Sequence, residues 1–273
     1  MQVFNEEWIN EDLPHFTKGD FRRLDESDDS NFYKITRFVE HIDAAAVAAL
    51  TSFHATEIRN MHNLLSQQKK VKDDDNNKDK DGYQQPKAIR VLDLCSSWTS
   101  HLPTGALDMV GEVVGVGMNT EELAANKQLS TFYTIDLNRD PSALSSIRKR
   151  KTHSETETET EEIKDTFDLV LLQLSVDYLT NPVQVLQQAA ALLTPHTGKI
   201  LITFSNRVFI DKAVAIWTGK ADIEHVNTVG DYLKASMKFQ MPTTTAGDIT
   251  PTGKNSRNGS GGDPLYVVSA TVK

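Results

Sequence analysis

Short polar groups follow five apolar runs of this sequence, at the points where each run ends. They occupy residues 93–98, 117–119, 136–138, 175–178 and 205–207. If the runs are parallel strands, their carboxyl ends meet at one edge of a sheet, where such sheets bind ligands. Arg207 could hold a substrate carboxylate there, because its guanidinium pairs with two oxygens at once. An arginine after a strand is also commonly only a surface charge.

The first of these groups differs from an ordinary nucleotide-binding loop. The stretch VLDLCSSWTSHLP, residues 91–103, leads from an apolar run into a loop without glycine. Glycines in such loops let a ligand approach bare backbone. Ser96 and Ser97 are small, and their hydroxyls could bind a carboxylate, while Trp98 could form a wall of the site. The alternative is that both serines begin a turn into the next helix.

A second polar group interrupts a nearly continuous apolar run. Ser175, Asp177 and Tyr178 follow FDLVLLQL, and burial of such groups without partners costs free energy. Asp177 could act as a general base or orient a nucleophile, and Tyr178 could line a pocket. Asp177 could equally cap the turn before Asn181.

The elements that would position these groups alternate along the chain. Strands are expected at 88–95, 112–118, 131–137, 167–176, 198–206 and 264–273, and helices at 41–67, 181–195, 208–219 and 226–236. The run FDLVLLQLSV is typical of a strand covered on both faces. This alternation predicts an α/β fold with a doubly wound, mostly parallel, Rossmann-like sheet. Arg37 and His41, four apart on a predicted helix, could form a lid over the sheet edge.

Three polar tracts are too poor in aromatic residues to form a core. They cover residues 67–87, 148–165 and 242–264. The expected organisation is an N-terminal helical cap over 1–66, a disordered insertion over 67–87, and a Rossmann-like domain over 88–273. Within that domain, 148–165 and 242–264 are predicted to be flexible loops.

Composition narrows the functional class. The 273 residues include 38 acidic and 29 basic ones, a net charge of −9, which disfavours a nucleic-acid surface. The single cysteine, Cys95, and eight scattered histidines argue against a metal site. No apolar run reaches the length of a membrane span, and the first residues lack a targeting pattern. The expected setting is cytoplasmic, with a small-molecule substrate and neither a nucleic-acid nor a membrane partner. The oligomeric state is not predicted.

The order of several motifs resembles a known superfamily. VLDLC, VVGVGMNTEEL, YTIDLN, FDLVLLQLSVDYL and LLTPHTGKILITFSNR together resemble class I S-adenosylmethionine-dependent methyltransferases. FRRLDESDDSNFY, RFVEHID and SNRVFIDKAVAIWTG are similar to an uncharacterised methyltransferase type 11-like group of bacteria, plants and algae. Outside the polar tracts the resemblance covers most of the chain. It implies S-adenosyl-L-methionine as the cofactor and methyl transfer as the activity.

The resemblance assigns cofactor contacts to individual strand ends. Asp93 matches the acid that supports the loop after the first strand and meets the amino group of the cofactor through water. Ser96 and Ser97 stand where glycines usually let the methionine part approach. Asp136, with Asn138 at the same strand end, matches the position that reads the adenine edge.

Further positions would surround the purine and the methyl group. Leu137 could stack on the purine. Ser175, Asp177 and Tyr178 match positions that face the transferred methyl, and Tyr178 could hold the sulfonium cation over its ring.

One position departs clearly from the superfamily. An acid usually ends the second strand and accepts hydrogen bonds from the ribose hydroxyls, but Gly117 stands at that place. Asn119 could accept one ribose bond through its amide oxygen. Asn119, followed by Glu121 and Glu122, is also an ordinary helix N-cap, and both roles could hold at once.

The sequence therefore favours a methyltransferase acting on a small molecule, with Arg207 as the clamp for an acceptor that bears a carboxylate. The acceptor atom can be sulfur, oxygen or nitrogen. The first alternative is a catalytically silent relative that binds a ligand or partner, supported by the missing glycines and ribose acid. A dinucleotide oxidoreductase would carry GxGxxG after the first strand, and this motif is absent.

Overall fold

The structure is a computed structural model that describes residues 12–76, 88–148, 166–252 and 262–273. Its centre is a seven-stranded sheet with the strand order β3-β2-β1-β4-β5-β7-β6. The strands are β1 Ile89–Leu94, β2 Val110–Gly117, β3 Thr131–Thr134, β4 Leu169–Gln173, β5 Lys199–Phe204, β6 Thr245–Asp248 and β7 Tyr266–Thr271. Strands β1 to β5 are mutually parallel, and β7 pairs antiparallel with β5 and β6. This confirms the predicted fold class.

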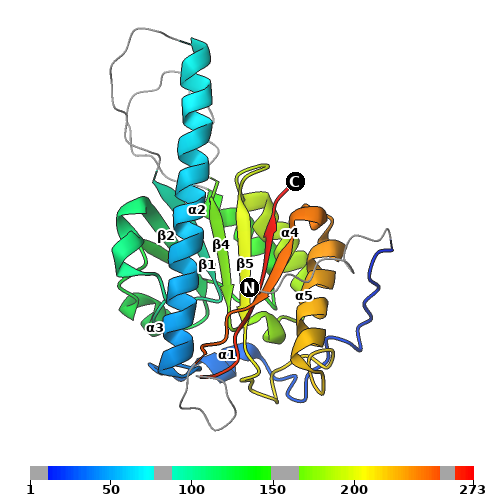
Figure 1. Cartoon of the computed structure of the whole chain (residues 1–273). Helices are drawn as coiled ribbons and strands as arrows, with labels where there is room; N and C mark the ends of the chain where they lie inside the picture. The colour runs from blue at the N-terminus through cyan, green and yellow to red at the C-terminus, as the bar shows by residue number, and fades with distance from the viewer. Residues whose placement is uncertain (1–11, 77–87, 149–165, 253–261) are drawn as a thin grey trace.

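Helices cover both faces of the sheet (Figure 1). The long helix α2, Ala44–Asn76, packs on one face together with the 3₁₀ helix η2, Thr104–Met109. The opposite face carries α4, Pro182–Leu192, and α5, Asp222–Ser236, with the 3₁₀ helix η3, Pro141–Arg148. Helix α3, Thr120–Ala125, contacts β2 and β3. The remaining short elements are α1 Asp29–Tyr33, η4 Val176–Tyr178 and η5 Met241–Thr243.

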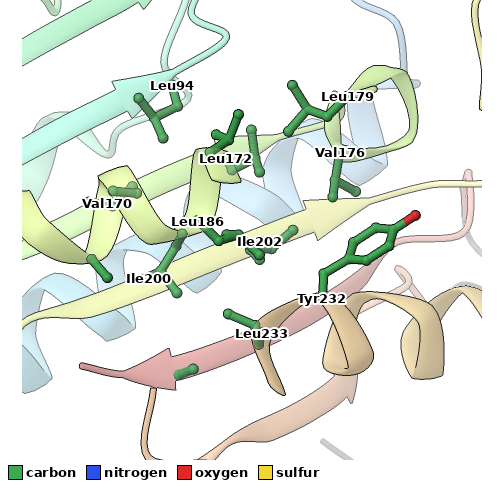
Figure 2. Packing of buried hydrophobic residues seen from close by; sticks show 14 of the residues in the cluster. Leu94, Val170, Leu172, Val176, Leu179, Leu186, Ile200, Ile202, Tyr232 and Leu233 are labelled. Atoms are coloured by element: carbon green, nitrogen blue, oxygen red, sulfur yellow. The ribbon is translucent and has the colours of Figure 1, made fainter. Parts of the chain in front are cut away.

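The two faces explain why the strand runs are continuously apolar. Ile89 and Val91 of β1 belong to the buried cluster that includes Ile58 of α2, whereas Leu92 and Leu94 belong to the cluster on the α4 and α5 side. Successive side chains of a strand point to opposite faces, so a strand covered on both faces needs apolar residues at nearly every position. Figure 2 shows part of the cluster that contains Leu94, between the sheet, α4 and α5.

Several predictions of secondary structure need correction. The predicted helix 208–219 is a series of turns, because its backbone bonds to the N-terminal segment: Ala215 N–H donates to Arg22 O at 2.7 Å and Ile216 N–H to Asp20 O at 2.8 Å. The predicted loop 242–264 instead supplies edge strand β6, although residues 253–261 lie outside the described residues.

The predicted disordered insertion 67–87 is helical at its start, since α2 continues to Asn76. The Lys and Gln residues at the start of this tract have high helix propensity, so the helix can continue into it. Residues 77–87 lie outside the described part of the chain, as do 149–165 of the predicted loop 148–165 and residues 1–11 of the predicted cap.

The segment preceding α2 forms a largely irregular N-terminal strap, which we define as residues 12–43. Its only regular helix is α1, so the predicted cap 1–66 is helical over α1 and α2 alone within the described chain. Arg37 and His41 lie in non-helical backbone rather than on one helix face. Figure 1 shows α1 below the carboxyl ends of the parallel strands. The strap therefore covers the edge of the sheet where polar strand ends were expected to gather.

A buried cluster of charges anchors the strap. Arg23 Nη1 contacts Asp29 Oδ1 at 2.8 Å, and Lys212 Nζ lies 3.3 Å from the same oxygen and 3.0 Å from Asp25 Oδ2. The side chains of Lys212 and Asp29 are almost fully buried. Burial opposes ionisation of Asp29, but hydrogen bonds from Arg23 and Asn138 and the Lys212 charge hold the pKa of Asp29 below its ordinary value.

We expect Asp29→Asn to lower the free energy of unfolding by about 3 kcal/mol, because two buried cations lose their shared anion. Urea unfolding followed by circular dichroism measures this loss. The exposed neighbour Asp28→Asn is the control, since an asparagine at the N-cap of α1 can still accept from Ser30 N–H. Equal stability of the two variants would show that the cluster does not hold the strap.

Candidate functional site

A cavity of about 500 Å³ lies between the carboxyl ends of β1 to β4 and the N-terminal strap. Its volume falls in the range of roughly 300–1,000 Å³ typical of small-molecule sites. Ten of the eleven predicted site residues line it: Asp93, Ser96, Ser97, Asn119, Asp136, Leu137, Asn138, Ser175, Tyr178 and Arg207. Asp177 does not. The cavity lies at the switch point of strand order, between β1 and its neighbours β2 and β4, as expected for a doubly wound sheet.

Asp93 is the centre of the hydrogen-bond network under this cavity. Its Oδ2 accepts from Ser96 Oγ at 2.7 Å and from Ser100 Oγ at 2.6 Å, and its Oδ1 accepts from Gln173 Nε2 at 3.0 Å. Burial raises the pKa of Asp93, while these three donors oppose the rise. Asp93 thus joins the loop after β1 to the end of β4, which agrees with its expected role in supporting the loop.

Internal bonds shape the glycine-free loop. Cys95 has a φ of 55°, a left-handed conformation that is uncommon for a residue with a side chain. Ser96 N–H donates to Val116 O at 2.7 Å, and Ser97 Oγ donates to Glu122 Oε2 at 2.5 Å. The hydroxyls of Ser96 and Ser97 already have protein partners, so a ligand role for them stays a prediction. Burial raises the pKa of the Cys95 thiol to about 12 and keeps it protonated.

The path of this loop explains the missing ribose acid. A Cβ placed on Gly117 would lie 2.1 Å from Ser96 O, far closer than van der Waals contact allows. The loop after β1 therefore fills the space that a side chain at Gly117 would need. No side chain can project from this position while the loop keeps its path.

We predict that Gly117→Ala lowers the free energy of unfolding by about 2–3 kcal/mol, because the loop backbone must move away from the new methyl group. Thermal unfolding of the purified variant measures this. Gly105→Ala is the matched control, since a Cβ there meets no atom within 4 Å. A Gly117→Ala variant as stable as Gly105→Ala would contradict the close packing.

Two asparagines expected to contact the cofactor hold the strap instead. Asn119 Oδ1 accepts from the N–H groups of Glu121 and Glu122 as the N-cap of α3, and its Nδ2 donates to Tyr33 O at 2.9 Å. The cap role is confirmed, and the oxygen proposed for the ribose is already occupied by two donors. These bonds fix α3 to the strap residue Tyr33.

Asn138 makes a similar set of bonds at the end of β3. Its Nδ2 donates to Asp29 Oδ2 at 2.8 Å and to Tyr178 O at 2.9 Å, and its Oδ1 accepts from Thr180 N–H at 2.8 Å. Asn138 therefore joins the strap to the turn after β4.

Asp136 and Leu137 form the wall beside β3. Asp136 Oδ1 accepts from the N–H groups of Asn138 and Arg139 at 2.9 and 3.1 Å. The carboxylate is half-buried and lines the cavity. Leu137 is buried beside it. One carboxylate thus organises the turn and at the same time faces the ligand space.

Gln173 is a cavity residue that the sequence analysis missed. Its Nε2 donates to Asp93 Oδ1 and, at 3.2 Å, to Ser100 O, which identifies the other atom as the amide oxygen. That Oε1 is buried without a hydrogen-bond partner among the described residues. An unpaired buried acceptor costs free energy and suits a ligand donor. The signal was present in the sequence, since Gln173 is the one amide within FDLVLLQLSV.

Aromatic side chains form the mouth of the cavity. Trp98 Nε1 donates to Val39 O at 3.2 Å, and its ring meets Phe38 edge-on. Trp98 lines the cavity and leaves it open. Elsewhere on the cavity wall, Phe209 N–H donates to Tyr178 Oη at 2.9 Å. Arg207 is mostly exposed, and its Nε lies 3.5 Å from Asp263 Oδ2.

Asp177 is buried outside the cavity, in η4. Its backbone oxygen accepts from Val214 N–H at 2.9 Å. Burial raises the pKa of the Asp177 carboxyl to about 7. This position does not support the direct contact between Asp177 and a cavity ligand that the sequence analysis suggested.

This pKa predicts a pH dependence of stability. Between pH 4 and 7 the unfolded chain releases the Asp177 proton while the folded protein retains it, so the contribution to stability is largest at acidic pH and falls as the pH rises to about 7. Asp177→Asn cannot ionise. Its free energy of unfolding relative to the native chain should therefore increase by roughly 2–3 kcal/mol between pH 5 and pH 8. Urea titrations at several pH values, with the exposed Asp140→Asn as control, measure the difference; a flat profile would contradict the assignment.

Comparisons with known proteins concern the domain and its fold. Residues 112–202 match the family model described as a methyltransferase domain. No curated protein sequence matches the chain significantly. Within the described residues, no cluster of three or more His, Cys, Asp or Glu side chains could hold a metal, and no helix is long and apolar enough to cross a membrane.

Several solved structures have a similar fold. An S-adenosylmethionine-dependent methyltransferase from Archaeoglobus fulgidus is 14% identical, with a TM-score of 0.44 and coverage of 67% of this chain and 86% of that one. A possible histamine N-methyltransferase from Thermotoga maritima is 11% identical, with a TM-score of 0.44 and coverage of 84% and 91%. A fibrillarin pre-rRNA processing protein from Methanococcus jannaschii is 14% identical, with a TM-score of 0.43 and coverage of 68% and 66%. At these identities the likeness concerns the fold alone.

Proposed function

We propose that this chain is a class I S-adenosylmethionine-dependent methyltransferase and that it methylates a small molecule that enters beside Arg207. The match of residues 112–202 to a methyltransferase domain and the doubly wound sheet support the first part. The observation that carries the proposal is the cavity at the strand ends, roofed by the strap and lined by ten residues selected from the sequence. A cytoplasmic location stays a prediction from composition.

The charges of the cavity wall suit a cationic methyl donor. The wall includes five carboxylates, of Asp29, Glu40, Asp93, Glu122 and Asp136, and two guanidiniums, of Arg37 and Arg207. Asp29 is neutralised by Arg23 and Lys212. The remaining excess of acids attracts positive charge, and a sulfonium with an ammonium group presents two such charges.

The donor set fits S-adenosylmethionine without the usual ribose acid. Asp136 offers a carboxylate to the adenine amine, with Leu137 beside it, and Gln173 Oε1 is an unpaired acceptor for the ammonium group. Since Gly117 carries no carboxylate and the Asn119 oxygen is occupied, the ribose contact is the weakest part of this fit. We therefore propose a lower affinity for the cofactor than a ribose carboxylate would give.

The cofactor supplies an activated methyl group, so the chain mainly has to hold the acceptor in line and exclude water. Tyr178, Phe209, Trp98 and Val39 all line the cavity, and the hydrogen bonds of Phe209 to Tyr178 and of Trp98 to Val39 hold this wall together. Because Asp177 lies outside the cavity, a direct general base is not part of this proposal. Acceptor atoms that react without one, such as a thioether sulfur, are compatible with the site. The acceptor atom itself can be sulfur, oxygen or nitrogen.

Calorimetric titration with S-adenosylhomocysteine tests the cofactor site. Asp136→Asn preserves the acceptor for the turn but removes the charge, so its affinity should fall on the order of tenfold, the loss of one charge-assisted hydrogen bond. Asp140→Asn is the control, since that exposed carboxylate bonds only within its own turn to Ser142.

Three outcomes would count against the proposal. Unchanged affinity in a folded Asp136→Asn variant would remove the adenine assignment. No heat from the native chain at millimolar ligand would favour the catalytically silent alternative. Methylation of RNA rather than small molecules by the native chain would refute the acceptor class.

A further inference from the structure

Exposed apolar side chains gather at the mouth of the cavity. We call Phe38, Val39, Val208, Phe209 and Ile210 the apolar collar. Their exposed fractions range from 37% to 56%. Val39, Val208 and Phe209 line the cavity, Phe38 packs edge-on against the lining residue Trp98, and Ile210 follows Phe209. Single exposed apolar residues are common, but a group that continues the wall of a ligand cavity indicates a binding surface.

Phe209 joins its part of the collar to the strap and to the turn after β4. Its ring lies edge-on to Phe32 and to His41 of the strap, each with centroids 5.4 Å apart, and 6.2 Å from the ring of Tyr178. Its backbone N–H donates to Tyr178 Oη. Phe209 is therefore held in place by the strap and by Tyr178.

One cation stands beside the collar with a weakly held partner. Arg207 is 61% exposed, and its ion pair with Asp263 spans 3.5 Å, longer than a direct charge-assisted hydrogen bond. The other guanidinium of the wall, that of Arg37, donates to Phe32 O at 3.0 Å and lies over the Phe32 ring. An incoming carboxylate can therefore replace Asp263 at Arg207 more easily than it can recruit Arg37.

We infer that the methyl acceptor is an amphipathic carboxylate: its apolar chain or ring lies on the collar, its carboxylate pairs with Arg207, and its reacting end enters the cavity. This inference rests on the proposed function and specifies its substrate class. A nucleic acid would meet both an apolar rim and a net charge of −9. A fully polar small molecule would leave the collar in water.

The test uses the full chain saturated with S-adenosylhomocysteine and titrated with butanoate, octanoate and octylamine below their micelle concentrations. Octanoate should bind at least about tenfold more tightly than butanoate, because added methylenes are removed from water on the collar. Octylamine should bind more weakly than octanoate. Equal affinities for butanoate and octanoate, or tighter binding of octylamine, would overturn the inference.

Variants outside the cavity wall separate the collar from the cofactor site. Phe38→Ser and Ile210→Ser should each weaken octanoate binding about fivefold. The affinity of each variant for butanoate should change little. Ile223→Ser is the matched control, since Ile223 is 44% exposed on α5 and does not line the cavity. Arg207→Gln should weaken butanoate and octanoate alike, by about tenfold, and leave their ratio unchanged.

The outcomes distinguish the two proposals. If S-adenosylhomocysteine does not bind the native chain but octanoate binds with the expected chain-length dependence, the proposed function fails and the collar assignment stands. If S-adenosylhomocysteine binds and Ile223→Ser weakens octanoate binding as much as Phe38→Ser does, the collar assignment fails. Sedimentation of the native chain with neutral phosphatidylcholine vesicles that Ile210→Ser abolishes would also overturn it, because the collar would then face a lipid surface.

Discussion

The buried carboxylate of Asp93 is the contact on which the cavity depends. It accepts three hydrogen bonds from Ser96, Ser100 and Gln173, and so fixes the loop after β1 to the end of β4. Desolvation of a carboxylate costs several kcal/mol and is offset here only because every donor is in place. The path of the loop then determines its neighbours. Its backbone at Ser96 forbids a side chain at Gly117, and its aromatic end at Trp98 meets the strap.

Polar contacts also attach the strap to the sheet. Asn119 and Asn138 each offer both ends of an amide, and each joins the strap to the carboxyl end of a different strand. The charged cluster around Asp29 adds a third attachment, through Lys212. The ligand space is therefore bounded on one side by the sheet and on the other by a segment held through these polar groups and through the rings of Phe16 and Phe21, which pack against Tyr232. Opening the roof would have to break both these hydrogen bonds and the aromatic packing on α5.

Much of this arrangement could be predicted from the sequence because strand ends are marked by a change from apolar to polar residues. That rule located all but one of the proposed site residues on the cavity wall. It failed at Asp177, because the direction of a side chain within a short 3₁₀ turn depends on local backbone that periodicity does not reveal. It also could not separate ligand contacts from structural ones at Asn119 and Asn138, since an amide bonds equally well to a ribose hydroxyl or to a backbone group.

The errors in secondary structure have similar causes. The segment 208–219 is not helical because its backbone bonds to the strap, and a contact between segments so distant in sequence leaves no local pattern. Strand β6 has four residues, one of them glycine, and its pairing with β7 supplies what its intrinsic propensity lacks.

The attachment of the strap to residues 211–216 also bears on how the molecule can be assembled. Lys212 and Asp25 are 187 positions apart, so the roof of the pocket leaves the ribosome long before the turn that fastens it. Contacts of such long range close late, since the intervening chain must first be ordered. The newly made N-terminal segment must therefore wait, with its cluster of charges still hydrated, until nearly the whole sheet has formed beneath it. In the living cell, the pocket would then be completed only after the sheet below it has formed.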